Sequence, residues 1–182
     1  MGCKLPELLW SITMCGIAGL FLKDRTLEGD LGALLAGMLA PLSDRGPDST
    51  GFDLCLVHNG SLSNHNAVRR ELIREGLTFQ TENDSEVAAG FITWQLHGGR
   101  SLEQAMAASL GALDGFYTFV IGAEQGFGVL RDPIACKPAV MAETERWVAF
   151  GTEYRALVDL PGIDGARVWE PAPAHVYRWE LH

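Results

Sequence analysis

Cys15 is the residue best suited to covalent chemistry, because it directly follows Met14 and opens a short apolar run. Cleavage between Met14 and Cys15 would leave a cysteine that carries both a thiol and a free α-amino group. An α-amino group has a reference pKa of about 7.7–8.0, so it can take the proton of a thiol near neutral pH. The residue would then be a nucleophile with its own base. A cysteine in an apolar run is otherwise a small core residue, and the surrounding motifs have to decide between the two roles.

Several short motifs follow one another along the chain. They are Met-Cys-Gly-Ile-Ala-Gly-Leu-Phe at 14–21, Asp-Arg-Gly-Pro-Asp-Ser-Thr-Gly at 44–51, Val-His-Asn-Gly at 57–60 and Asn-Asp-Ser-Glu at 83–86. Further matches lie at 113–119, 130–133, 137–138 and 150–157. In this order the motifs resemble the class II glutamine amidotransferases, whose glutaminase domains are of the N-terminal nucleophile (Ntn) type. The most similar branch is the amidotransferase subunit of N-methylglutamate synthase and of other glutamate-synthase-like complexes.

The resemblance implies a role for each matching residue. Cys15 would attack the side-chain amide of L-glutamine, releasing ammonia and leaving a γ-glutamyl thioester that water then cleaves. Asn59 and the backbone N–H of Gly60 would form the oxyanion hole, whose donors meet negative charge as it develops. Asp84 would bind the α-amino group of the substrate. No metal and no bound cofactor is implied for this chain, although a synthase partner of the resembling kind carries flavin.

Other roles for the same residues stay open. Asn-Gly is the commonest two-residue hairpin turn, so Asn59 and Gly60 could instead connect two strands. Asp84 is also a candidate N-cap of the helix that follows, and both of its roles hold if only one carboxylate oxygen caps. Arg45 and Asp48 are interpreted as scaffold residues. The resemblance also extends to positions near the rear strands for which we expect no catalytic role, namely Asp132, Lys137 and Glu153.

The chain departs from the family pattern at its start. The family requires cysteine at the mature N-terminus, and here residues 1–13 precede Met14. Either translation begins at Met14, or residues 1–14 are a propeptide that is removed. If neither holds, the α-amino group of Cys15 is an amide and the mechanism fails. We therefore expect residues 1–13 to be a leader or a mis-assigned start, and residues 14–182 to be one glutamine amidotransferase domain.

A second departure lies between Gly51 and His58. Family members carry a long stretch there, with sheet strands and an arginine that binds the substrate α-carboxylate. Only residues 52–57 separate the two positions here, and none of them is arginine. An arginine–carboxylate pair is bidentate and charge-assisted, so a neutral group does not replace it. Part of the usual sheet is expected to be missing, which would leave a sheet edge or gap.

The elements that must position these residues follow from the hydrophobic periodicity. We predict strands at 15–22, 52–58, 116–121, 126–131, 139–142, 147–151, 167–170 and 175–181. Helical spacing and capping signals predict helices at 30–42, from 63 or 64 to 75, from 84 to 98, and after the capping box that Ser101 and Gln104 form. This order favours one α+β domain. The resemblance narrows it to the four-layer α-β-β-α sandwich of the Ntn hydrolases.

Composition excludes some classes of function. The 182 residues have a formal net charge of −9, a poor match for the phosphate backbone of a nucleic acid. The four cysteines show no C-x-x-C pair and the five histidines no ligand spacing, which favours a reducing, cytoplasmic setting without a metal site. Residues 8–22 loosely imitate a secretory signal, but the run is too short for a membrane span.

Three hypotheses about function follow. In the first, the chain is a glutaminase subunit that supplies ammonia to a separate synthase subunit, since 182 residues leave no room for an acceptor domain. In the second, it is a non-catalytic amidotransferase-like protein that serves assembly or regulation. In the third, it is an exported or anchored binding domain directed by residues 8–22. We expect the first.

Overall fold

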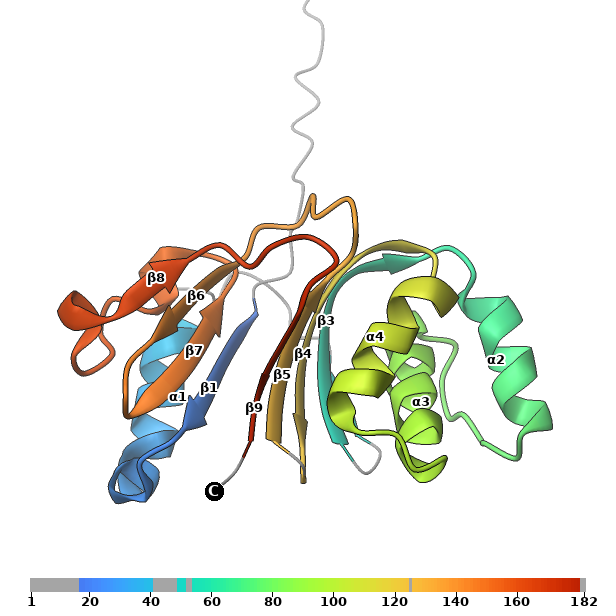
Figure 1. Ribbon diagram of the computed structural model, residues 1–182, viewed down its shortest axis with the longest axis horizontal. Helices are drawn as coiled ribbons and strands as arrows, with labels where there is room; N and C mark the ends of the chain where they lie inside the picture. Colours follow the sequence, from blue (N-terminus) through green and yellow to red (C-terminus); the bar gives the residue numbers. More distant parts are fainter. Residues whose placement is uncertain (1–16, 41–48, 52–53, 125, 181–182) are drawn as a thin grey trace, which may run out of the picture.

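The computed structural model describes residues 17–40, 49–51, 54–124 and 126–180, and these form a four-layer α-β-β-α sandwich. Two antiparallel sheets face each other in the middle (Figure 1). Helix α1 lies outside the smaller sheet, and helices α3 and α4 cover the outer side of the larger one, with α2 beside α3. The predicted α+β class and the four layers are confirmed.

The two sheets are built from strands that lie far apart in the sequence. The smaller sheet has the order β1-β7-β6-β8, with bounds Ala18–Leu22, Trp147–Gly151, Val140–Glu143 and Arg167–Trp169. The larger sheet has the order β2-β3-β4-β5-β9, with bounds Ser49–Gly51, Leu54–Leu62, Gly115–Ala123, Gly126–Arg131 and Val176–Trp179. Strands β3 and β4 pair along their full length, from Leu54 opposite Ala123 to Leu62 opposite Gly115.

The structure has four α-helices in its described residues, and the N-termini of α3 and α4 are capped by side chains. Their bounds are Leu31–Leu39 for α1, His65–Arg74 for α2, Asp84–His97 for α3 and Leu102–Ala112 for α4. Short 3-10 turns occupy Arg25–Asp30, Tyr154–Ala156 and Ile163–Gly165. The predicted capping box is confirmed, because Ser101 Oγ accepts from Gln104 N–H while the Gln104 side chain accepts from Ser101 N–H. Gly76, with φ 95°, follows the end of α2 as predicted.

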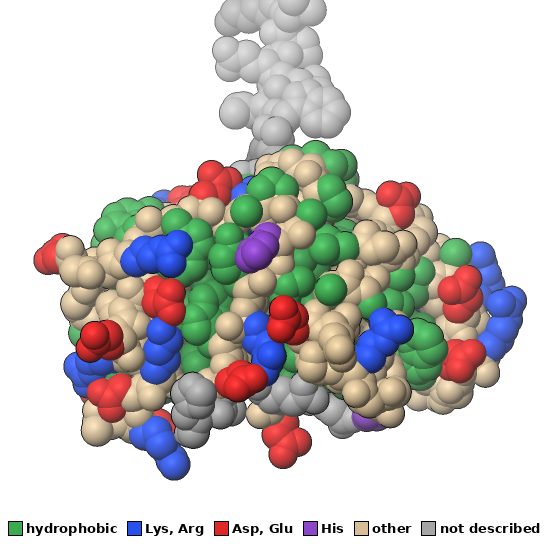
Figure 2. Space-filling model, in the orientation of Figure 1, with side chains coloured by type: hydrophobic (Ala, Val, Ile, Leu, Met, Phe, Trp, Pro, Cys, Tyr) green, Lys and Arg blue, Asp and Glu red, His purple; other side chains and the backbone are tan. Residues whose placement is uncertain are grey.

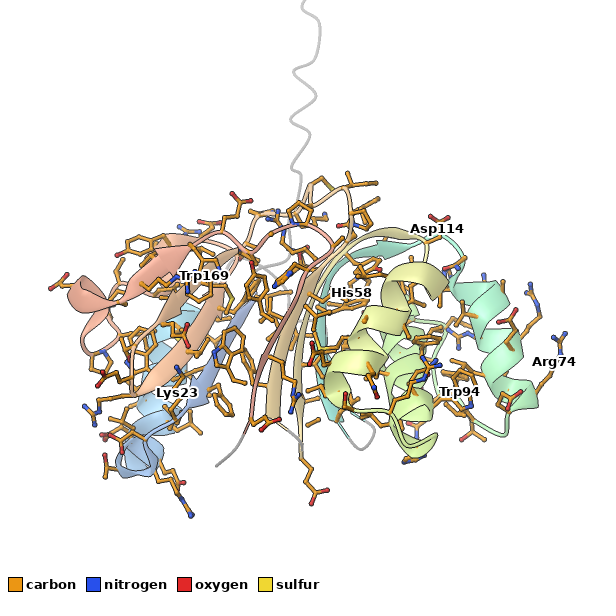
Figure 3. All side chains as sticks on the ribbon, in the orientation of Figure 1. Lys23, His58, Arg74, Trp94, Asp114 and Trp169 are labelled. Atoms are coloured by element: carbon orange, nitrogen blue, oxygen red, sulfur yellow. The ribbon has the colours of Figure 1, made fainter. Side chains whose placement is uncertain are left out.

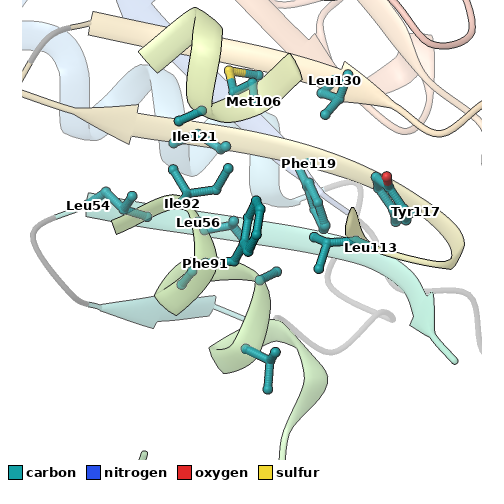
Figure 4. Close-up of a cluster of buried hydrophobic side chains, with 14 of the residues drawn as sticks. Leu54, Leu56, Phe91, Ile92, Met106, Leu113, Tyr117, Phe119, Ile121 and Leu130 are labelled. Atoms are coloured by element: carbon teal, nitrogen blue, oxygen red, sulfur yellow. The ribbon is translucent and has the colours of Figure 1, made fainter. Parts of the chain in front are cut away.

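Each interface between layers has its own hydrophobic core. The core between α2–α4 and the larger sheet includes Leu56, Ile92 and Phe119 (Figure 4). A second core lies between the two sheets and includes Val120 and Phe150. A third, between α1 and the smaller sheet, is formed by residues such as Met38, Trp147 and Ala149. Alternate residues of β4 and β7 thus point to opposite faces, as the period of two predicted.

Most predicted elements lie where the sequence placed them. Strand β2 was not predicted, β3 continues beyond its predicted end at His58 to Leu62, and the start of α3 needs a correction. Strands β5 and β7 have the predicted bounds. The N-cap of α3 is Asn83 and not Asp84, because Asn83 Oδ1 accepts from Ser85 N–H at 2.9 Å. Asp84 is the first helical residue. Cys15, Arg45 and Asp48 lie outside the described residues.

The short connection before His58 folds into a hairpin. Strand β2 pairs antiparallel with β3, Gly51 lies opposite Cys55, and β2 is an edge of the larger sheet.

On the face shown in Figure 2, acidic and basic side chains are interspersed, so the negative charge of the chain is not concentrated on this face. No helix within the described residues has both the length and the apolar character needed to cross a membrane.

Candidate active site

Strand β3 carries Asn59 and Gly60 inside a sheet, so their interpretation as a hairpin turn is wrong. Asn59 lies opposite Thr118 and Gly60 opposite Tyr117 in the β3–β4 ladder. The next residues on the same face as Asn59 are Val57 and, across the ladder, Val120, which belong to the core between the sheets. The side chain of Asn59 therefore points into the space between the two sheets.

The side-chain amide nitrogen of Asn59 is buried. The residue is 2% exposed, and its Nδ2 has no hydrogen-bond partner in the part of the chain that the structure describes. A buried amide that loses water and gains no partner costs free energy, about 1–3 kcal/mol. Such a group is typical of a site whose partner arrives with the substrate. Its N–H groups are suited to donate to a developing oxyanion.

Gly60 is required by the close approach of the neighbouring strand. A Cβ atom at this position would lie 2.0 Å from Phe116 O and 2.6 Å from Tyr117 Cα. Any other side chain would push β3 and β4 apart. Glycine is therefore the residue that allows the two backbones to come this close at the end of the ladder.

The N–H of Gly60 points away from β4. The backbone N–H of Tyr117 donates to Asp132 Oδ1 at 3.1 Å, and its carbonyl accepts from Asp132 N–H at 3.0 Å. Both groups of Tyr117 thus face β5, which makes Gly60 and Tyr117 a non-hydrogen-bonded pair. The N–H of Gly60 lies on the β2 side, where β2 begins at Ser49, opposite Val57. None of the described β2 residues lies opposite Gly60, whose N–H points to the β2 side of the strand.

Asp84 joins the start of α3 to the end of β3. Its Oδ2 accepts from Leu62 N–H at 2.8 Å, two residues beyond Gly60. Its other oxygen, Oδ1, lies 3.6 Å from His58 Nδ1, which is longer than a hydrogen bond. The Asp84 side chain is 19% exposed, so the carboxylate is reachable from solvent. Asp84 therefore contacts β3 at Leu62 and lies near His58, the residues that flank Asn59 and Gly60 along the strand.

His58 lies beneath the site, between the larger sheet and the helices (Figure 3). Its Nδ1 is 3.0 Å from Ser85 Oγ in α3, and its ring meets the Phe119 ring edge-on at 5.2 Å between centroids. These contacts tie the middle of β3 to the first turn of α3. These contacts give His58 a structural role.

A buried carboxylate organises the loop that leads into Asp84. Glu86 Oε1 accepts from Gln80 N–H at 2.7 Å, and Oε2 accepts from Thr81 N–H at 2.8 Å and from Thr81 Oγ1 at 2.7 Å. Arg69 donates to the carbonyls of Thr81 and Asn83. Burial alone would raise the pKa of Glu86, but these hydrogen bonds and the Arg69 charge outweigh it and lower the pKa.

Arg131 and Asp132 organise the loop after β5. Asp132 Oδ2 accepts from Ile134 N–H at 2.7 Å and from Ala135 N–H at 3.1 Å, and Asp132 is fully buried. The Arg131 guanidinium donates to the Lys137 carbonyl at 2.6 Å and to Glu170 Oε1 at 2.7 Å. The Asp132 carboxylate accepts from three backbone N–H groups, those of Tyr117, Ile134 and Ala135, which gives it a structural function.

Sequence analysis missed Thr118, which lies across the ladder from Asn59. The sequence contained a sign of a special role, because Thr118 is a polar residue inside the apolar run of β4. Sequence alone does not show which residue of β3 it faces. Within the described residues, no group of three or more His, Cys, Asp or Glu side chains is arranged to hold a metal ion.

The four layers with two facing antiparallel sheets match one class of protein, the Ntn-type glutamine amidotransferase fold. Comparison of the sequence with known protein families supports the same class. Residues 41–159 match the family model described as a glutamine amidotransferase domain. The match covers more than half of the chain, which therefore belongs to this family.

The relatives at sequence level are longer than the region they share with this chain. The glutamine amidotransferase-like protein GlxB of Rhizobium meliloti (strain 1021) is 66% identical over 134 residues, which cover 74% of this chain and 44% of the relative. A putative glutamine amidotransferase of Methanothermobacter thermautotrophicus is 33% identical over 129 residues, covering 71% of this chain and 42% of the relative. The chain thus spans less than half the length of these relatives.

A solved structure shares the fold. The glutamine phosphoribosylpyrophosphate amidotransferase of B. subtilis superposes with a TM-score of 0.60 at 27% identity, over 75% of this chain and 30% of that one. The match is thus confined to a minor part of the larger enzyme.

Proposed function

We propose that this chain hydrolyses the side-chain amide of L-glutamine and supplies the ammonia to a partner synthase subunit. Cys15, once it is the N-terminal residue, provides the thiolate, and its own α-amino group takes the thiol proton. The sulfur attacks the amide carbon, and the proton passes to the leaving nitrogen, which departs as ammonia. Water then cleaves the γ-glutamyl thioester and restores the thiol, so that glutamine and water become glutamate and ammonia.

The proposal rests mainly on one observation: Asn59 Nδ2 is buried without a hydrogen-bond partner among the described residues, next to the Gly60 N–H, which points away from β4. Two neighbouring N–H donors are what a tetrahedral oxyanion requires. Asp84 is proposed to bind the substrate α-amino group. Its partial exposure supports this role, as does its hydrogen bond from the N–H of Leu62, which lies two residues beyond Gly60 on β3.

The ammonia acceptor is proposed to be a separate synthase subunit of the glutamate-synthase-like kind, as in N-methylglutamate synthase. In one relative the shared region is a small part of a larger protein. The glutamine--fructose-6-phosphate aminotransferase of Bartonella quintana is 43% identical over 68 residues, only 11% of its length. We also propose a cytoplasmic location, with which the free thiols of Cys55 and Cys136 agree.

A second candidate function is a non-catalytic assembly or regulatory role. The two-residue connection between β2 and β3 favours it, because the family's carboxylate-binding arginine belongs to the stretch that this hairpin replaces. Without that arginine, the affinity for glutamine depends on Asp84 and the oxyanion donors. A Michaelis constant well above the millimolar range would indicate this second role.

Intact mass spectrometry separates the two candidates. The full chain and a version that starts at Met14 are purified and treated with a glutamine-mimicking electrophile, with Cys15→Ala as the matched control. A mass that begins at Cys15 and gains one adduct, absent from the control, supports the glutaminase. Retention of residues 1–14 with no adduct, together with no ammonia release from glutamine by either version, supports the non-catalytic role.

A further inference from the structure

A second unpartnered polar group lies beside Asn59. Thr118 is fully buried, and its Oγ1 has no hydrogen-bond partner among the residues that the structure describes. In the β3–β4 ladder Thr118 lies directly opposite Asn59. Residues directly opposite in an antiparallel pair place their side chains on the same face, with Cβ atoms about 4.5–5.5 Å apart. Both unpartnered groups therefore face the space between the two sheets.

The described residues around Thr118 do not account for a hydroxyl group at this position. The next β4 residue on its face is Val120, in the apolar core between the sheets, and valine has the same shape as threonine. A buried hydroxyl without a partner destabilises the fold relative to that isostere. Two such groups in register indicate a ligand that satisfies both.

The two groups have complementary chemistry. Asn59 Nδ2 is a donor, whereas the Thr118 hydroxyl oxygen accepts as well as donates. A primary carboxamide has one carbonyl acceptor and one –NH2 donor. Its carbonyl oxygen can accept from Asn59 Nδ2 while its –NH2 group donates to Thr118 Oγ1. A carboxylate or an ester presents no N–H.

We propose that Thr118 is a substrate-contacting residue that selects the amide of glutamine. Its Oγ1 accepts a hydrogen bond from the substrate –NH2 group while Asn59 Nδ2 donates to the carbonyl oxygen. The inference rests on the proposed glutaminase function and adds to it the residue that recognises the leaving group. An ester of glutamate makes only the Asn59 contact.

The test compares Thr118→Val, which removes the hydroxyl at constant shape, with Thr118→Ser, which keeps it. Each variant is assayed for kcat/KM on glutamine and on the γ-methyl ester of glutamate. Loss of one neutral hydrogen bond predicts that Thr118→Val lowers the value for glutamine about five- to tenfold and the value for the ester less than about twofold. Thr118→Ser should restore most of the glutamine value.

Thr93→Val is the matched control. Thr93 is also buried with an unpartnered Oγ1, but it belongs to α3, away from the space between the sheets. This variant should leave both substrates unaffected. Equal losses on both substrates in Thr118→Val, or no loss on either, would overturn the assignment of Thr118 alone. A wild-type protein that hydrolyses neither substrate would refute the proposed function, and the role of Thr118 with it.

Discussion

Replacing Asn59 with alanine should lower activity and raise stability at the same time. The lost oxyanion donor predicts a fall in kcat of about 10²–10³, equivalent to about 2.7–4 kcal/mol at the transition state. Its unpartnered Nδ2 at 2% exposure currently costs the folded state about 1–3 kcal/mol. The small cavity left by the amide offsets part of that gain. We expect the free energy of unfolding to rise by about 1 kcal/mol.

Ammonia release measured with a coupled assay gives kcat, and urea unfolding followed by circular dichroism gives stability. Ser109→Ala is the control, since Ser109 is equally buried but its Oγ donates to Met106 O at 2.6 Å. That variant should lose about 1 kcal/mol of stability and keep its activity. An Asn59→Ala protein that is less stable than wild type and fully active would refute the argument that Asn59 is held for a substrate.

Three further variants test the backbone and the buried groups. Gly60→Ala places a Cβ 2.0 Å from Phe116 O and should lower the free energy of unfolding by more than about 2 kcal/mol, as measured by urea unfolding. The control is Gly122→Ala, whose Cβ would have no atom within 4 Å. It should lower the free energy of unfolding by less than about 1 kcal/mol. Glu86→Gln should remove stability that the wild type has above pH 4.5, because the pKa of Glu86 is lowered in the folded state. The wild-type advantage should shrink as pH falls below 4.5, and an advantage that does not change with pH would contradict this. Burial raises the pKa of Tyr117 to about 12, so its phenol stabilises the fold below pH 10 and loses this effect as pH rises towards 12. Tyr117→Phe should therefore unfold less readily than wild type at pH 11.5 in the same assay, and equal sensitivity would refute the assignment.

Local signals predicted the elements well because each depends on residues near in sequence. Strand β5 combines an apolar run with a glycine at its start, and α4 begins at a capping box whose partners are three residues apart. Such interactions form whenever the segment folds, so the sequence shows them directly.

Asn59 and Gly60 show where local reasoning failed. Asn-Gly favours a turn only when the flanking residues pair with each other. Here β3 continues through both residues because it pairs along its whole length with β4, more than fifty residues later. The same kind of long-range contact moved the cap of α3 from Asp84 to Asn83, since the Asp84 carboxylate is engaged by Leu62 N–H.

The sequence by itself determined the class of protein, the order of its helices and of its strands apart from β2, and the candidate residues Cys15, Asn59, Gly60 and Asp84. Only the tertiary structure decided that Thr118 lies opposite Asn59, that Asn59 Nδ2 and Thr118 Oγ1 have no partner among the described residues, and that the N–H of Gly60 points away from β4. The physical reason is that residue types and spacings are properties of one segment. Register, burial and hydrogen-bond satisfaction are properties of two segments brought together.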